Sequence, residues 1–354
     1  MDWSAPGRRD TFKAVMVSTS DLNAELGSLP MTEGSVFRRY YSETKTGGTL
    51  TVSESPGRNL VRIYVESELD GESERTVLGT FFPRWDSVSS SFGLDTYDLS
   101  LESTLVRLSE DMTPYALSYP AGTTAWSTAK SIMADCLMQY KEGLGAYASA
   151  KTTATVSFDA GTSWLTVVNG LLTAVGLSSL SVDAMGYAFT EPYISPESRR
   201  VAYEFTRENC VYAPGLSRST TEGDIPNRVI VTATIDGDDV AAVRDLPASS
   251  PYSAKARGRR KSEMYSCDDV DTKSALEAKA DLYFRAIASY VETESIEHTY
   301  APVSDGDVVR LMYGDGGTTR DSLCMVQDME IKLESGMTTS SKLSVIRWIG
   351  ETNG

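Results

Sequence analysis

The chain has 354 residues, of which 41% are hydrophobic and 23% are charged, and its formal net charge at pH 7 is −16. This composition lies in the globular range and excludes intrinsic disorder, and no apolar run is long enough to cross a bilayer. The acidic balance argues against binding duplex DNA by neutralising its phosphates, because that mode needs clustered Lys and Arg. At this length we expect two or three domains, each with its own core.

Residues 1–118 show the pattern of β-structure. Apolar and polar residues alternate over 59–66, the sequence Leu-Asp-Gly-Glu at 69–72 is typical of a tight turn, and 76–82 follow as a second strand. Alternation returns at 96–101. We therefore predict a hairpin followed by a further strand, within a small antiparallel sheet or barrel. The first fifty residues match no pattern that we can place.

Residues 119–200 are predicted to form a helix-containing α+β domain. A threonine pair is suited to cap a helix whose apolar positions follow the helical period up to Tyr140. A second helix follows Thr162 and ends at Gly176, which is expected to adopt a left-handed cap. Residues 180–189 are typical of a strand, a tight turn and a strand.

Residues 201–354 return to β-structure, with a strand at 228–235 and an inserted loop region around 236–270. A helix over 272–290 carries a single apolar stripe, so we expect it to lie across a curved antiparallel sheet. That sheet is built in part from three predicted strands at the end of the chain: 308–313, 323–333 and 342–349.

Few residues in this sequence are suited to catalysis. His298 is the only histidine, and no serine lies in a G-x-S-x-G elbow, so a hydrolytic triad is poorly supported. The aspartates at 236–239 and at 305–307 match no calcium loop, and we interpret both groups as solvated turns. We predict no catalytic, cofactor-binding or metal site, and we expect free, mostly buried thiols at Cys136, Cys210, Cys267 and Cys324.

One basic run interrupts this acidic chain. It lacks the interleaved aromatic residues of a single-strand nucleic-acid site. A plain solvated loop and a DNA contact are the alternatives to a subunit interface. We favour a subunit interface in which this loop faces an acidic surface of a neighbouring copy. The candidate interface residues are Lys255, Arg257, Arg259, Arg260 and Lys261.

Several stretches taken in order resemble the tail-hub, or minor tail, proteins of long-tailed bacteriophages of the siphophage type. Each match is short, and the shared order along the chain supplies the specificity. They begin with Gly-Thr-Phe-Phe-Pro at 79–83 and include Glu-Pro-Tyr-Ile-Ser-Pro at 191–196. The others lie at 121–123, 163–172, 224–231, 250–253 with 258–259, and 306–309.

The resemblance implies two tail-tube-like β-barrel or sandwich domains, 1–118 and 201–354, around the helix-containing region 119–200. It further implies a homotrimer whose six tube-like domains form a pseudo-six-fold ring that joins the tail tube to the tail tip. The implied partners are other copies of the chain, the distal tail or tail-tube protein, the tape measure protein and other tail-tip proteins. DNA would pass through the lumen without specific binding, and an acidic lumen suits such a passage.

The expected location is the tail tip of the virion, after synthesis in the host cytoplasm, because residues 1–10 lack the apolar stretch of a signal peptide. We expect a structural protein and no enzyme. The alternatives are a receptor-binding or a cell-wall-degrading tail-tip protein. The first is suggested by aromatic and Gly-rich loops near Tyr187, Tyr193 and Tyr313, and the second would use Asp305 or Asp307.

Overall fold

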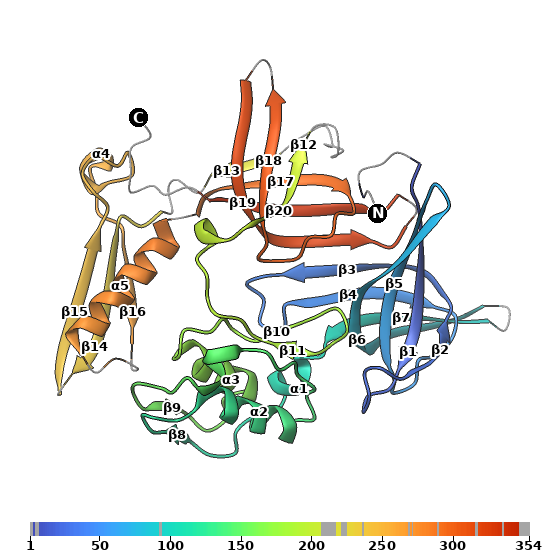
Figure 1. The fold of residues 1–354 in the computed structure, drawn as a ribbon, viewed down its shortest axis with the longest axis horizontal. Helices are drawn as coiled ribbons and strands as arrows, with labels where there is room; N and C mark the ends of the chain where they lie inside the picture. The colour runs from blue at the N-terminus through green and yellow to red at the C-terminus, as the bar shows by residue number, and fades with distance from the viewer. Residues whose placement is uncertain are drawn as a thin grey trace.

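The computed structural model describes residues 3, 7–91, 94–206, 217–220, 225–235, 237–267, 270, 272–288, 290–315, 318–334 and 336–346. The fold is α+β and mainly β, as the sequence predicts. Its largest element is a 13-stranded sheet, and the helices lie in two smaller regions beside that sheet (Figure 1). In the described part of the chain, no helix has the length and apolar character needed to span a bilayer.

The first part of the chain forms half of the large sheet. Its strands are all antiparallel to their neighbours and run in the order β3-β4-β7-β6-β5-β1-β2. They are β1 (Arg9–Val17), β2 (Glu25–Leu29), β3 (Met31–Arg39), β4 (Thr46–Val52), β5 (Leu60–Leu69), β6 (Glu72–Ser91) and β7 (Leu94–Ser103). The predicted hairpin is confirmed as β5 and β6, and the predicted further strand as β7. The strands β1 to β4 lie in the part of the predicted β-structure 1–118 for which we predicted no individual strand.

The turn of the β5–β6 hairpin has the backbone that its sequence requires. Asp70 has a φ of 52° and Gly71 a φ of 85°, and Leu69 pairs with Glu72 across the turn. Positive φ at both central residues is the mark of a type I′ turn, which Asp-Gly favours and which matches the twist of a hairpin. The hairpin register is therefore fixed by two residues.

The last part of the chain completes the large sheet. It contributes β12 (Val201–Thr206), β13 (Ser217–Thr220), β17 (Tyr290–Thr299), β18 (Val308–Asp315), β19 (Thr318–Lys332) and β20 (Thr338–Ile346). The three predicted final strands are confirmed as β18, β19 and β20, and residues 347–349 lie outside the described part. β12 pairs with β18 in parallel, and the other pairings of these strands are antiparallel.

The two β-rich parts share one core. β3 pairs antiparallel with β19, with Val36 opposite Ile331, and this pairing joins the two halves of the sheet. Buried side chains from both halves, including Phe81 and Phe205, belong to a single hydrophobic cluster. A sheet that buries apolar side chains from both ends of the chain is stabilised chiefly by this burial.

The middle region packs its helices around a second core. Its elements are α1 (Val106–Ser109), β8 (Leu117–Tyr119), α2 (Ala125–Asp135), η1 (Gly145–Ser149), β9 (Val156–Phe158), α3 (Trp164–Thr173), β10 (Ser181–Val182), β11 (Ala188–Phe189) and η2 (Pro196–Ser198). The two predicted helices and the strand-turn-strand segment are confirmed. Trp126 and Leu171 are among the side chains buried in this core. Gly176 has the predicted left-handed φ, 77°.

The first predicted helix is shorter than its apolar period suggests. α2 ends at Asp135, and Leu137, an apolar residue inside the stretch up to Tyr140 that we predicted as helical, has a φ of 58° and is 76% exposed. A left-handed residue cannot continue a right-handed helix. Met138 is buried in its place, in the irregular segment that follows the helix, so the predicted apolar period breaks at the helix end.

A third region forms a separate small sheet covered by a helix. It comprises β14 (Arg228–Ile235), β15 (Asp238–Asp245), α4 (Ala254–Arg257), β16 (Ser262–Ser266) and α5 (Lys273–Ala288). β14 confirms a predicted strand, and α5 confirms a predicted helix. However, α5 packs on β14 and β15 through Leu276 and Ala280, and the expectation that it crosses the antiparallel sheet of the final strands is wrong. The small sheet is also mixed, since β14 and β16 are parallel.

Candidate functional site

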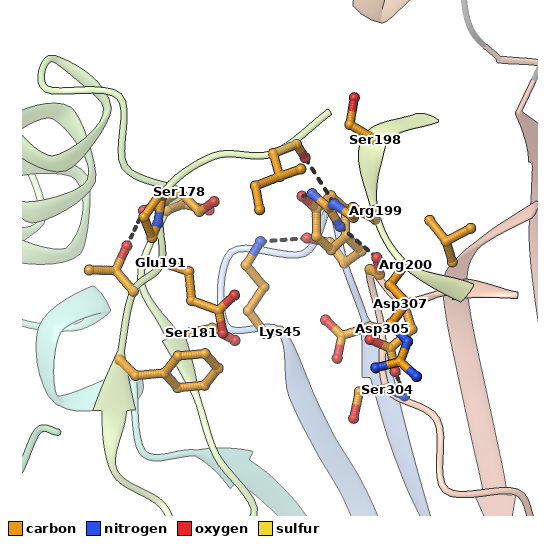
Figure 2. A pocket seen from close by; sticks show the side chains of 18 residues that line it. Lys45, Ser178, Ser181, Glu191, Ser198, Arg199, Arg200, Ser304, Asp305 and Asp307 are labelled. Atoms are coloured by element: carbon orange, nitrogen blue, oxygen red, sulfur yellow. Dashed lines mark hydrogen bonds between the residues drawn. The ribbon is translucent and has the colours of Figure 1, made fainter. Parts of the chain in front are cut away.

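A cleft with a volume of about 480 Å³ lies where three parts of the chain meet. Tyr40 and Lys45, from the turn between β3 and β4, contribute its floor. The segment 178–200 of the middle region and the loop 304–308 before β18 line its two sides. Lys45 points into the cleft between these two sides (Figure 2). The cleft is therefore a junction between regions rather than a cavity within one of them.

The loop at 304–308 is held in one conformation by its own backbone. Gly306 has a φ of 81°, and a Cβ atom there would lie 2.6 Å from the Tyr40 ring, so only glycine fits. The main-chain N–H of Ser304 donates to Asp307 Oδ2 at 2.7 Å. Asp307 thus closes the turn that presents Asp305 to the cleft.

Two arginines connect the three parts around the cleft. Arg38, only 9% exposed, donates from Nη1 to the carbonyl of Val303 at 3.0 Å and from Nη2 to that of Leu78 at 3.1 Å. Arg199 donates to the carbonyls of Ile194 at 2.9 Å and Gly306 at 2.5 Å. Arginine suits this use because its planar fork carries several donors in fixed directions.

The charged groups of the cleft, Lys45, Asp305 and Asp307, are half-buried. Burial raises the pKa of both Asp305 and Asp307, and the charge of Arg38 opposes this rise. Burial lowers the pKa of Lys45, and the charge of Asp305 opposes that fall. Asp305 and Asp307 are half-buried, so the turn at 305–307 is solvated only in part. A raised carboxyl pKa is a property of general acids, so Asp305 and Asp307 are the residues on which a hydrolytic activity should be tested.

A second junction joins the first sheet to the middle region through a fully buried arginine. Arg62 of β5 is 1% exposed and donates from Nε to Thr80 Oγ1 at 2.8 Å. Its Nη2 donates to the carbonyl of Leu22 at 2.6 Å and to that of Met185 at 3.2 Å. Its Nη1 lies 3.9 Å from Glu25 Oε1. A buried charge is tolerated only when it is paired and hydrogen-bonded, and this one is both.

The basic run lies on the small region, at α4 and the turn that follows it. Ser253 caps α4 by accepting from Ala256 N at 3.2 Å, and Gly258 ends it with a left-handed φ of 67°. Among the basic residues, Lys255, Arg259 and Arg260 are exposed, whereas Arg257 and Lys261 are half-buried. The run therefore presents charge to solvent from a defined turn.

His298 is a buried structural residue. It is 2% exposed, and its ring nitrogens lie 2.6 Å from the carbonyl of Thr299 and 2.8 Å from Ser341 Oγ. Burial lowers its pKa to about 4. These contacts use both nitrogens and leave none for a substrate.

The cysteines and the aspartates at 236–239 are the remaining candidates from the sequence. Cys136, Cys267 and Cys324 are free thiols, the last two buried, and Cys210 lies outside the described residues. Asp238 and Asp239 are exposed at the start of β15, and Asp236 is also outside the described part. Within the residues that the structure covers, no three His, Cys, Asp or Glu side chains are grouped to hold a metal ion.

The aromatic loops differ in what they expose. The Tyr187 hydroxyl accepts a hydrogen bond from Asn23 at 2.9 Å, and its ring packs on buried residues of β1 and β5, so it helps join two regions. Tyr193 is 42% exposed, and the side chain of Tyr313 lies outside the described part. Sequence reasoning did not single out two large apolar side chains of the β6–β7 hairpin, Trp85 and Val88, which are about half exposed.

Comparison of the sequence with known protein families and with curated proteins found no match. Solved structures with the same fold are, however, found. A tail protein from Neisseria meningitidis is similar with a TM-score of 0.67 and 12% identity, over 96% of this chain and 98% of that one.

Two further tail proteins are similar over almost their whole length. A 43 kDa tail protein of a Shewanella oneidensis prophage has a TM-score of 0.60 and 11% identity, covering 97% of this chain and 100% of that one. A prophage tail protein from Listeria monocytogenes has a TM-score of 0.54 and 11% identity, covering 94% of each chain. At the level of the fold, these similarities confirm the resemblance to phage tail proteins that the sequence indicates.

Proposed function

We propose that this chain is a structural protein of a phage tail, a hub at the tail tip that assembles into a trimeric ring. The observation that carries the proposal is the fold similarity to tail proteins over nearly the full length of both chains. The conserved extent matters, because a shared catalytic module would align over a part of the chain only.

In the proposed mechanism the large sheet positions neighbouring subunits. β2 and β13 lie at the two ends of the strand order, so each has one edge without a strand partner in the described sheet. Such edges invite pairing with another chain, and a ring that pairs them removes the hazard. Each chain would contribute two β-rich halves to the ring, giving pseudo-six-fold symmetry around DNA that passes without specific binding. The net charge of −16 supports such a passage.

The partners in this proposal are copies of the chain, the distal tail or tail-tube protein, the tape measure protein and other tail-tip proteins. Imaging assembled tails that carry a label on this chain tests the proposal directly. We expect density on the tail axis between the tube and the tip. Label away from the axis, or its absence from the particle, would refute the hub assignment.

A cell-wall hydrolase is the second candidate, and the raised pKa of Asp305 and Asp307 in the junction cleft is the observation in its favour. The test is to incubate the purified protein with cell-wall material and to measure soluble fragments, with Asp305→Asn as the matched variant. Release that Asp305→Asn abolishes would establish the enzyme. No release from either protein would leave the carboxyls with their role at the junction.

A further inference from the structure

The basic loop is organised before it meets any partner. Asn227, only 1% exposed, donates from Nδ2 to the carbonyl of Arg259 at 3.0 Å, and its Oδ1 accepts from the N–H of Lys261 at 2.9 Å. The Arg257 guanidinium donates to the carbonyl of Ile225 at 2.8 Å. A loop fixed in this way loses little conformational entropy when it docks.

The exposed cations of this loop lack an ion-pair partner among the described residues of their own chain. Within the described residues, no carboxylate forms an ion pair with Lys255, Arg259 or Arg260. Asp245 lies close enough to interact with Arg260, but its ion pair is with Arg228, at 2.7 Å. The loop therefore offers positive charge to another molecule.

The β5–β6 hairpin end carries the opposite charge. Glu68, Asp70 and Glu72 are exposed around its type I′ turn, and in the described part of the chain no lysine or arginine forms an ion pair with them. Arg9 is the cross-strand neighbour of Glu68, but the two side chains form no ion pair in the described part of the chain. Like charges crowded on one turn repel one another, so the hairpin would be stabilised by a cationic partner.

The two surfaces lie apart on the molecule. Figure 1 places α4 at one end of the long axis, and β5 and β6 in the opposite half. They cannot meet within one chain, but they can meet between two chains arranged head to tail. A head-to-tail contact repeats through a rotation and closes into a ring when that rotation divides a full turn.

We infer that the basic loop of one copy (Lys255, Arg259, Arg260) docks on the acidic β5–β6 hairpin end of the next copy (Glu68, Asp70, Glu72). The inference rests on the proposed ring and identifies one of its contacts. Copies that each carry a net charge of −16 repel at long range, so association needs a local patch of the opposite sign. The contact sets the direction in which copies follow one another around the ring.

The test reverses each surface separately and then both together. The loop variant is Arg259→Glu with Arg260→Glu, the hairpin variant is Glu68→Lys with Glu72→Lys, and the combined variant carries all four changes. A control, Arg58→Glu with Lys151→Glu, alters net charge as the loop variant does, at exposed positions elsewhere. Circular dichroism verifies folding, and sedimentation velocity across a concentration series measures association at low and high salt.

We expect each single-surface variant to lower the association constant by about tenfold or more, and the wild-type association to weaken as salt rises. The combined variant should recover to within about threefold of wild type, because its reversed surfaces again attract each other. The control should associate as wild type does. An equimolar mixture of the loop and hairpin variants should form pairs but no closed trimer, since any three-membered ring then retains one repulsive contact.

The outcomes separate this inference from the proposed function. The docking contact would be overturned, and the ring left intact, if neither single-surface variant changed the association seen in wild type. The same conclusion would follow if both variants lost association and the combined variant did not recover it. A wild-type chain that stays monomeric at every concentration would refute the ring and the contact together.

Discussion

Replacing Arg62 with methionine removes the buried charge that joins the first sheet to the middle region. Methionine approximates the volume of the arginine stem but donates no hydrogen bond. The carbonyls of Leu22 and Met185 would each lose a donor, at 2.6 Å and 3.2 Å respectively. Thr80 would still donate to the carbonyl of Ala184 at 2.9 Å. The main loss is therefore at two carbonyls, one on each side of the junction.

The size of the effect follows from these contacts. A polar group left buried without its partner costs about 1–3 kcal/mol, so two carbonyls give a loss of a few kcal/mol. The removed guanidinium no longer has to be desolvated, which offsets part of that loss. We expect Arg62→Met to lower the free energy of unfolding by about 3 kcal/mol, within the range seen when one partner of a buried ionic network is removed.

Urea unfolding followed by circular dichroism measures the change, and Arg84→Met is the matched control. The Arg84 side chain is 65% exposed and pairs with Glu102 at 2.7 Å, so its loss should cost less than about 1 kcal/mol. Hydrogen exchange at the amide of Tyr187, which donates to Asp183 Oδ1 at 2.9 Å, reports whether the turn beside Met185 loosens. Equal stabilities for the two variants would refute the role assigned to Arg62.

Three further outcomes test separate parts of the fold. Burial lowers the pKa of His298 from 6.5 to about 4, so its stabilising contribution is complete above pH 6.5 and is lost as pH falls toward 4. The free energy of unfolding should therefore fall between pH 7 and pH 5 by about 2 kcal/mol more in wild type than in His298→Phe. Leu137→Gly should raise the thermal midpoint, because the left-handed backbone costs a leucine about 1 kcal/mol that glycine does not incur. An unchanged or lower midpoint would contradict this. Gly48→Ala should destabilise by about 2 kcal/mol or more, because its Cβ would lie 2.2 Å from the Ser35 carbonyl oxygen, and a soluble variant with wild-type urea midpoint would argue against that clash.

The elements that sequence reasoning placed are those with a local signal. The Asp70-Gly71 turn sets its hairpin by backbone conformation alone, and the buried face of α3 repeats at the helical period. The strands β1 to β4 lack such a signal. β4 contains Gly47 and Gly48, which pack closely against neighbouring strands, so their strand conformation is imposed by tertiary contacts.

The junction cleft could not be predicted, because its residues are brought together by topology. Lys45, Arg199 and Asp305 lie far apart in the sequence, and none belongs to a recognisable motif. The same applies to α5, whose apolar stripe predicted a covered sheet but did not identify which one. In contrast, the basic run stood out by charge alone, and the structure places its residues on an ordered turn whose interface role stays a prediction.

The pairing of β3 with β19 has a consequence for how the protein is made. Val36 and its partner Ile331 lie about 300 residues apart in the sequence, so Val36 leaves the ribosome well before Ile331 is synthesised. Translation proceeds at about 5–20 residues per second, so the edge of β3 remains open for many seconds while the rest of the chain emerges. During that interval nascent chains on one messenger could cross-pair, and a chaperone that shields this edge should raise the yield of soluble protein. The joint that unites the two halves therefore cannot form until β19 has emerged.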